Sequence, residues 1–212
     1  FTFCTVQGDL LAVLFHYAVQ SSVLDGACLP DGTRKVSGDL AGQAMRCIET
    51  AYAGKAIAIF GLGAAGDQAP LMQAVYYAEA GENNWLQRGI QQMRELGNSL
   101  GQAVLDAIAH SSVPMIDDRL QLCRSEIRLR AQCLPERRAL RATRQYVYQP
   151  AGDIVLPLEF WQLGNLVLLG VRPELCAVTA QVLHQAMQHR TVLVFTMVNG
   201  AAKYMAPKEA YA

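Results

Sequence analysis

Residues 61–66 have the spacing most suggestive of a reactive site, because their glycines match G-x-G-x-x-G after a short apolar run. In dinucleotide-binding proteins, such glycines let the backbone approach a pyrophosphate at a helix N-terminus. Glu79 lies at a suitable distance downstream to bind a ribose. However, Asp67 would place a negative charge beside the phosphate, and Pro70 would break the second turn of the helix. We therefore favour a tight glycine loop and keep a nucleotide-binding oxidoreductase as a third alternative.

Cysteine and histidine are the next candidates for metal or redox chemistry. The six cysteines form no Cys-x-x-Cys pair: Cys4, Cys28, Cys47, Cys123, Cys133 and Cys176. This spacing gives little support to a zinc finger or a redox motif. Four of them lie in apolar periodic segments and are expected to be small buried hydrophobic residues: Cys4, Cys47, Cys123 and Cys176. His110 and His189 fall at predicted helix C-termini, where the helix dipole accounts for them better than a metal does.

Composition excludes several classes of protein. The chain has 212 residues, of which 18 are basic, 18 are acidic, 52% are apolar and 17% are charged. A net charge of zero lacks the basic surface that binds phosphates, so we predict no nucleic-acid partner. Half-apolar composition excludes disorder, and no apolar run reaches the roughly 18–20 residues that a transmembrane helix needs. No signal peptide is visible, and the start at Phe1 leads us to expect a truncated chain.

The elements that would position these residues follow from hydrophobic periodicity and turn residues. They predict an α/β fold, a layered mixed β-sheet flanked by helices around one continuous core. Predicted strands cover residues 1–5, 10–19, 55–60, 120–130, 154–162, 166–171 and 191–198. Predicted helices cover residues 40–52, 85–109, 136–144 and 174–189. The strand over 10–19 is almost entirely apolar, so we expect it to be covered on both faces. A break in alternation near Ser125 predicts a β-bulge.

Four separated segments carry a family resemblance. They are LAVLFHYAVQSSVLDG (11–26), VSGDLAGQAMRCIE (36–49), IAIFGLGAAGDQAP (57–70), and VRPEL (171–175) together with NGAAKYMAPKEAY (199–211). They resemble the neutral/alkaline ceramidase family, zinc-dependent amidases that cleave the fatty-acyl amide of ceramide. The resemblance implies that residues 1–212 form one ceramidase-like α/β domain that lacks its N-terminal half. It also implies a small-molecule or lipid amide substrate and a secreted or cell-surface location, and it leaves the oligomeric state open.

The resemblance assigns part of a zinc site. Glu174 matches the family's Glu ligand and Tyr204 its Tyr ligand, while Gln20 occupies the position of a His ligand and would line the substrate site. A further His ligand would lie upstream of this sequence. A neutral Gln carbonyl is a weak zinc ligand beside imidazole. His16 cannot easily replace the missing imidazole, because four residues along a strand separate it from Gln20 by about 13 Å.

The resemblance also assigns a catalytic loop. Gly66 and Asp67 are kept from the family's Gly-Asp-x-Ser-Pro segment, but Ala69 stands where the family has its active-site Ser. We expect Gly66 and Asp67 to serve catalysis and Ala69 to contact substrate without a hydroxyl. The first hypothesis is therefore a zinc-dependent amide hydrolase whose site is completed by upstream residues. The main alternative is a relative that kept the fold and lost this chemistry, serving as a binding or structural domain.

Overall fold

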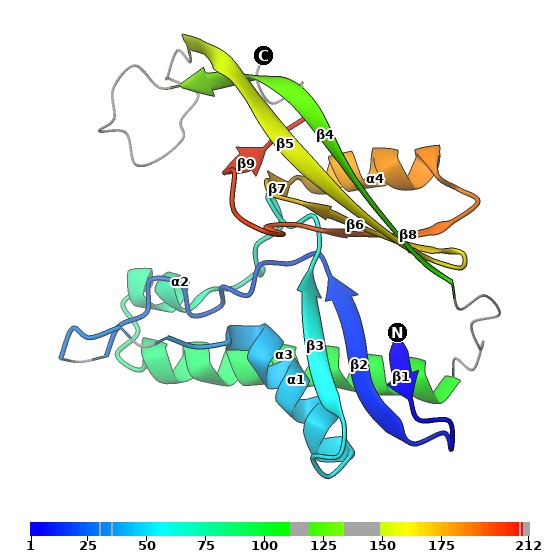
Figure 1. Ribbon diagram of the computed structural model, residues 1–212. Coiled ribbons are helices and arrows are strands. Elements are labelled where there is room, and N and C mark those ends of the chain that lie inside the picture. The colour runs from blue at the N-terminus through cyan, green and yellow to red at the C-terminus, as the bar shows by residue number, and fades with distance from the viewer. Residues whose placement is uncertain (30, 35, 111–118, 134–148, 208, 210–212) are drawn as a thin grey trace.

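The computed structural model describes residues 1–29, 31–34, 36–110, 119–133, 149–207 and 209 (Figure 1). Within these residues the chain forms two larger β-sheets, one small two-stranded sheet and flanking helices. The predicted α/β fold is therefore confirmed. The helix predicted over residues 136–144 lies outside the described part of the chain. None of the described helices is long and apolar enough to span a membrane.

The first sheet contains the N-terminal strands, in the order β1 (Thr2–Cys4), β2 (Leu10–Tyr17) and β3 (Ile57–Leu62). β1 is antiparallel to β2, while β3 is parallel to it. The parallel pairing requires a crossover, which includes helix α1 (Asp39–Ala51). On the helix-covered face, Val13, Phe15 and Ala58 pack against Ile48 of α1. On the other face, where no described helix lies, Ala12, Leu14 and His16 are only partly buried, so the prediction that residues 10–19 are covered on both faces holds for one face only.

Glycines bring the helices of this half very close together. The long helix α3 (Trp85–His110) packs against α1 and against the short helix α2 (Ala74–Glu79). A Cβ at Gly97 would lie 2.5 Å from Cβ of Gln43, and one at Gly101 would lie 2.6 Å from Cβ of Cys47. Only a residue without a side chain fits at such separations. The predicted helix over 85–109 is thus confirmed, whereas α2 was not predicted.

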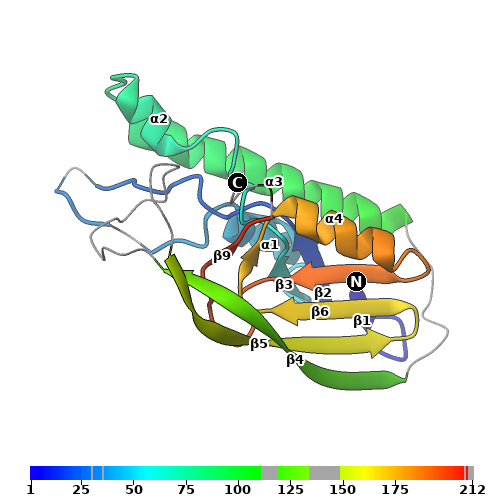
Figure 2. The same ribbon diagram turned by 90° about the horizontal axis from the view of Figure 1, so that it is seen from above.

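The second sheet is built from the C-terminal half of the chain. Its order is β4 (Leu120–Cys133), β5 (Gln149–Leu163), β6 (Leu166–Val171) and β8 (Thr191–Phe195). Helix α4 (Ala177–Ala186) covers one face, where Val167, Leu169 and Val194 form the core with Ala180 of the helix. Helices α3 and α4 lie on the same side of the molecule (Figure 2). Each large sheet therefore has one side covered by helices and one side that no helix of the described residues covers.

Several element boundaries differ from the predicted ones. The helix predicted from residue 174 begins at Ala177, because Glu174–Leu175 forms strand β7, which pairs with β9 (Tyr204–Met205) in the tail. The predicted bulge near Ser125 is wrong, since the register of β4 shifts between Arg130 and Gln132. Of the four cysteines expected to be buried, only Cys176 is; Cys4 and Cys123 are exposed and Cys47 is partly exposed.

A polar seam joins the two large sheets at the ends of β2, β3 and β8. The backbone N–H of Thr196 donates to the carbonyl of Leu62 at 3.1 Å, and its hydroxyl donates to the carbonyl of Gly63 at 3.0 Å. His16 Nε2 donates to the carbonyl of Val194 at 2.7 Å. A Cβ at Gly61 would collide with the ring of Phe195, which explains a glycine there. The seam fixes how the second half of the chain meets the first.

Candidate functional site

Glu174 and Tyr204, the two residues matched to metal ligands, are partners in the β7–β9 ladder. Residues paired in register present their side chains on the same face of a sheet. The N–H of Glu174 donates to the carbonyl of Lys203 at 2.9 Å, which ties the two strands together. Glu174 is half-buried, whereas the Tyr204 side chain is 57% exposed. The structure thus brings a carboxylate and a phenol side by side from segments 30 residues apart.

Gly66 lies directly against the Glu174 segment. Its N–H donates to the carbonyl of Leu175 at 2.8 Å. A Cβ at Gly66 would lie 2.8 Å from the carbonyl oxygen of Glu174 and 2.9 Å from that of Leu175. These neighbours are backbone atoms that cannot rotate away, so the close approach requires glycine. The contact gives Gly66 a role in positioning Glu174, and its predicted catalytic role stays a prediction.

Asp67 caps helix α4 from 110 residues away. Its Oδ1 accepts the N–H of Ala177, the first residue of α4, at 2.8 Å. The residue before the helix, Cys176, makes no side-chain cap of its own, so Asp67 satisfies a donor that would otherwise lack a partner in the helix. The pKa of the Cys176 thiol is raised, mainly by burial and also by the nearby Asp67 carboxylate. Asp67 therefore holds the strand-to-helix junction that contains Glu174, while a direct part in catalysis stays a prediction.

Gln20 and Ala69 flank the same loop. The N–H of Gln20 donates to the carbonyl of Gln68 at 2.9 Å, so the end of the first sheet reaches the loop that contains Gly66 and Asp67. Gln20 is partly buried, and Ala69 is exposed. The six residues assigned from the resemblance thus lie on adjoining segments, which we call the candidate site: Gln20, Gly66, Asp67, Ala69, Glu174 and Tyr204.

Asp39 stabilises the loop that follows Gln20 of the candidate site, a role that the sequence did not predict. Its carboxylate accepts backbone N–H groups from Val23 at 3.0 Å, Leu24 at 2.7 Å and Leu40 at 2.7 Å. Asp39 is only 6% exposed and has a positive φ of 50°. A buried carboxylate that accepts three N–H groups fixes the loop that follows Gln20. Asp is a common residue type at a helix N-terminus, but only the fold reveals the link to residues 23 and 24.

His16 serves the seam and not the candidate site. Burial is the main cause that lowers the pKa of His16, and the hydrogen bond to the Val194 carbonyl partly opposes this shift. Its ring also contacts Phe195 edge to face, with centroids 5.1 Å apart. Because Nε2 is engaged and the ring is packed, His16 does not supply the imidazole that Gln20 replaces.

The glycine loop lacks the geometry of a dinucleotide site. After β3 ends at Leu62, no helix begins before Ala74. The N–H of Gly66, which would face a pyrophosphate in a dinucleotide site, donates a hydrogen bond to the carbonyl of Leu175. A phosphate site of this kind needs free N–H groups at a helix N-terminus. The structure therefore favours the tight-loop interpretation of residues 61–66.

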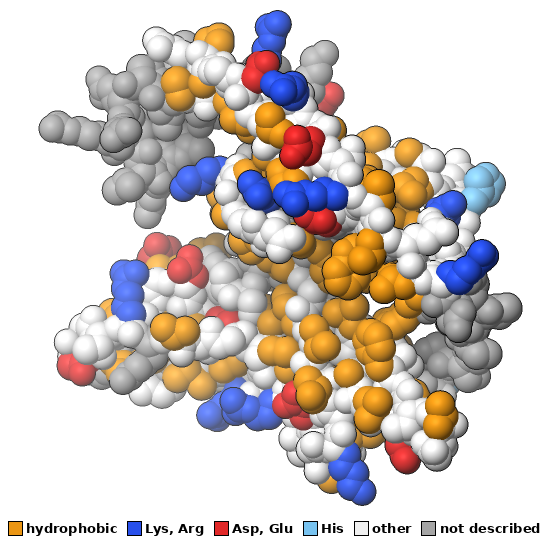
Figure 3. All heavy atoms as spheres, in the orientation of Figure 1, with side chains coloured by type: hydrophobic (Ala, Val, Ile, Leu, Met, Phe, Trp, Pro, Cys, Tyr) orange, Lys and Arg blue, Asp and Glu red, His pale blue; other side chains and the backbone are white. Residues whose placement is uncertain are grey.

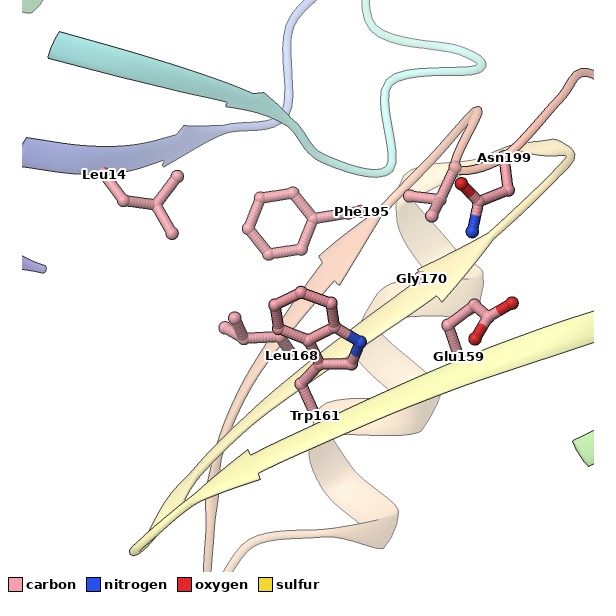
Figure 4. Close-up of a pocket in the computed structure, with 8 residues that line it drawn as sticks. Leu14, Glu159, Trp161, Leu168, Gly170, Phe195 and Asn199 are labelled. Carbon is pink, nitrogen blue, oxygen red and sulfur yellow. The ribbon is translucent and has the colours of Figure 1, made fainter. Parts of the chain in front are cut away.

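A cavity lies elsewhere, between the two large sheets (Figure 4). It has a volume of about 310 Å³, and Trp161, Phe195 and Leu14 form much of its apolar wall. Glu159 and Asn199 add polar groups. None of the six candidate-site residues lines this cavity. The residues matched to family chemistry and the apolar space that could hold a ligand are therefore separate in this chain.

The donor set for a zinc ion is incomplete in this chain. Zinc sites in proteins usually have at least three nitrogen, oxygen or sulfur ligands from side chains. Across the part of the chain that the structure describes, no group of three His, Cys, Asp or Glu side chains could hold a metal. Glu174 and Tyr204 supply two oxygen donors, and Gln20 adds a weak amide at most. The residues present do not fit a zinc ion by themselves.

Comparison with known proteins defines the class by fold. No family model matches the chain, and no curated protein matches it in sequence. The structure of neutral ceramidase from Pseudomonas aeruginosa matches with a TM-score of 0.72 and 16% identity, over 100% of this chain and 41% of that one. A structure of a ceramidase complexed with C2 matches with a TM-score of 0.70 and 16% identity, over 100% of this chain and 42% of that one.

The chain therefore has the fold of a part of neutral ceramidase, as the sequence resemblance predicted. It spans about two fifths of the length of these structures. At 16% identity, the likeness establishes the fold and not the reaction.

Proposed function

We propose that this chain is part of an amide hydrolase of the ceramidase type, in which Glu174 and Tyr204 form one wall of a metal-dependent active site. The substrate is a small-molecule or lipid amide. The observation that supports the proposal most directly is the registered pairing of Glu174 with Tyr204 beside Gly66 and Asp67. Residues matched to a family site from four separate segments occupy one place in the fold.

Zinc would supply polarisation of the amide carbonyl or activation of water in such a site. Since the described residues provide only two good oxygen donors, the remaining ligands would have to come from residues outside the described part of the chain. Within the chain, hydrogen bonds of Gly66 and Asp67 hold the backbone around Glu174, which fixes the position from which the Glu174 side chain extends. Ala69 offers no hydroxyl to a substrate, so any hydrogen bond from a hydroxyl group to the substrate is made by another residue.

The test uses the longest natural polypeptide that contains this sequence. Zinc is measured by mass spectrometry, and hydrolysis is followed with a fluorescent ceramide. We expect stoichiometric zinc, and we expect Glu174→Gln and Tyr204→Phe each to reduce both zinc content and hydrolysis. Glu79→Gln is the matched control, because Glu79 is exposed at the end of α2. Absence of stoichiometric zinc, together with unchanged hydrolysis in Glu174→Gln, would refute the proposal.

A second candidate is a relative that kept the fold without this chemistry. Gln20 and Ala69 favour it, because both replace functional side chains at the positions matched to the family site. This second candidate predicts that the wild-type protein neither binds zinc nor hydrolyses the fluorescent ceramide. It also predicts that the double substitution Gln20→His and Ala69→Ser raises the zinc content. The location outside the cell that the resemblance implies stays a prediction.

A further inference from the structure

The loop between β8 and β9 connects the seam to the candidate site, and hydrogen bonds fix both of its ends. At one end, the N–H of Val198 donates to the carbonyl of Val171 at 2.9 Å. At the other end, the carbonyl of Lys203 accepts the N–H of Glu174 at 2.9 Å. The residues between Val198 and Lys203 must therefore bridge a fixed distance.

The backbone of this loop requires an unusual set of dihedral angles. Asn199 has a φ of 55°, and Gly200 has a φ of 133°. Met197 and Lys203 also adopt positive φ angles, of 58° and 59°. Asn tolerates the left-handed region better than most residues do, and the angle of Gly200 suits glycine. The strained loop thus accounts for the pair Asn199–Gly200, which is the only Asn-Gly pair in the sequence.

An Asn-Gly pair is a chemically reactive sequence. The backbone nitrogen of the glycine can attack the side-chain carbonyl carbon of the asparagine, because glycine has no Cβ to hinder the approach. The nitrogen loses its proton to water and bonds to that carbon, while the side-chain amide gains a proton and leaves as ammonia. The product is a succinimide ring, which water opens at either carbonyl to give aspartate or isoaspartate. The reaction consumes water and needs no oxidant, reductant or cofactor.

Both reacting groups of this pair are accessible. Asn199 and Gly200 are exposed, and neither the Gly200 N–H nor the Asn199 side-chain amide forms a hydrogen bond with any described residue. Asn98 of α3 is held differently, because its side-chain oxygen accepts a hydrogen bond from Gln43 at 2.9 Å. The residue after it, Ser99, lies inside the helix, where backbone N–H groups are paired. Contacts of the described residues therefore protect Asn98 but not Asn199.

Arg172 lies beside this pair and favours the conversion. Its Nε is 3.6 Å from the place that a Cβ on Gly200 would occupy. Nε is buried without a hydrogen-bond partner, and no described carboxylate lies within ion-pair distance of the side chain. A cation here stabilises the negative charge that the Gly200 nitrogen develops as it loses its proton. It also stabilises a product carboxylate, because charge-assisted hydrogen bonds are stronger than neutral ones.

We propose that Asn199 is a site of spontaneous deamidation, and that the carboxylate formed there pairs with Arg172. The conversion replaces a neutral amide by a negative charge in the wall of the cavity (Figure 4). Basic and acidic side chains already lie together over the second large sheet, so this face accommodates a further charge (Figure 3). The inference depends on the loop and not on hydrolysis, so it stands or falls separately from the proposed function.

The isoaspartate product also lengthens the loop. In isoaspartate the main chain runs through the side-chain carbon, which adds a methylene group to the path between Val198 and Gly200. Because both ends of the loop are hydrogen-bonded and its backbone is already strained, we expect the extra length to displace β9. This displacement weakens the pairing of Glu174 with Tyr204. Deamidation therefore links the age of the protein to the geometry of the candidate site.

Peptide mass spectrometry in isotopically labelled water tests the site. The natural polypeptide is kept folded at mildly alkaline pH, and incorporation of labelled oxygen is followed at each asparagine. We expect Asn199 to convert at least about tenfold faster than Asn98, because only Asn199 is followed by glycine in an exposed loop. An isoaspartate-specific methyltransferase should label the product. If Asn199 converts no faster than Asn98, the loop protects the pair and the proposal is wrong.

Two substitutions test the pairing with Arg172. Asn199→Asp introduces the product carboxylate directly and should raise the midpoint of thermal unfolding by about 2–4 °C, because it gives the buried Nε an acceptor. The same substitution in an Arg172→Gln background should give no such rise. Asn165→Asp is the control, because Asn165 is exposed in the turn between β5 and β6. A rise that is equal in both backgrounds, or absent from both, contradicts the assigned pair.

Hydrogen exchange tests the effect on the candidate site. Aged protein with isoaspartate at position 199 should exchange the N–H groups of Glu174 and Cys176 faster than fresh protein, because both groups donate to carbonyls of the β9 segment. Fresh Asn199→Asp protein is the control, since it has the new charge without the longer main chain. Equal protection in aged and fresh protein would mean that the loop absorbs the extra length, which would overturn the link to the candidate site.

Discussion

The candidate site and the open apolar faces of the two large sheets differ in the kind of interaction that defines them. Backbone hydrogen bonds and close contacts hold the candidate site: Gly66 to Leu175, Asp67 to Ala177, and Glu174 to Lys203. The open faces carry exposed apolar side chains such as Ile57, Leu122 and Trp161. The first region is positioned by contacts within the described chain, whereas the apolar side chains of the second stay exposed in the described part of the chain. Mutations should therefore be costly around the candidate site even where the residues are far from any cavity.

The largest effect is expected at Asp39. Replacing it with Ala leaves three backbone N–H groups, of Val23, Leu24 and Leu40, without their acceptor. We expect a loss of about 2–4 kcal/mol in the free energy of unfolding, measured by urea denaturation. Asp106→Ala on the exposed face of α3 is the control and should change stability by less than about 0.5 kcal/mol. Equal effects of the two substitutions would show that Asp39 does not support the candidate site.

The next largest loss of stability is expected from Gly66→Ala. The new Cβ would lie 2.8 Å from a backbone carbonyl, so the loop and the Glu174 strand have to separate. We expect a loss of about 1–3 kcal/mol, measured in the same way. Gly152→Ala is a matched control, because a Cβ there meets no atom within 4 Å and the φ angle is not positive. A Gly66→Ala protein as stable as Gly152→Ala would mean that this contact is looser than the structure implies.

Asp67→Ala should have a smaller effect, since Asp67 is exposed and caps α4 through a single hydrogen bond. We expect a cost of about 1 kcal/mol. The same change should lower the pKa of the Cys176 thiol, because it removes the carboxylate charge that helps to raise it. The thiol pKa should stay above its ordinary value, since burial is the larger cause. The rate of thiol alkylation against pH, in mild denaturant if needed, measures this shift.

The smallest effect is expected for the pH dependence of stability that His16 of the seam causes. The pKa of His16 is lowered in the folded chain from its ordinary value of 6.5, so the unfolded chain binds a proton more readily. The contribution of His16 to stability is therefore complete above pH 6.5 and is lost as pH falls from 6.5 through the lower folded-state pKa. Urea denaturation at a series of pH values, compared with His16→Gln, isolates this dependence. A wild type whose pH profile matches that of His16→Gln would exclude the seam as its source.

The sequence predicted most of the secondary structure because its signals are local. The apolar repeat of residues 85–109 and the two strands predicted over 154–162 and 166–171 are read over a few positions, and the structure confirms a helix and a strand pair there. Prediction failed where a distant segment decided the outcome. Glu174 looks like the first turn of a helix, but pairing with Tyr204 makes it a strand. The short α2 was missed because six residues give too little periodicity.

For the candidate site, too, the sequence named residues but not the distant contacts that hold them. The resemblance to the ceramidase family was enough to name the six residues Gln20, Gly66, Asp67, Ala69, Glu174 and Tyr204. Their contacts were not predictable, since Asp67 meets Ala177 across 110 residues of sequence. Asp39 could not be recognised as a partner of the site, because its importance comes from the backbone N–H groups that the fold buries beside it.

The sequence alone thus determined the α/β class, the apolar strands and the family whose motifs the chain resembles, because periodicity and residue type are properties of short stretches. The tertiary structure decided that the glycine loop holds a strand and not a nucleotide. It also decided that the residues matched to the family meet without a complete set of metal ligands among the described residues, and that each large sheet keeps one apolar face that no described helix covers. These outcomes depend on which backbone groups and side chains are brought together in space, and residues far apart in sequence decide that.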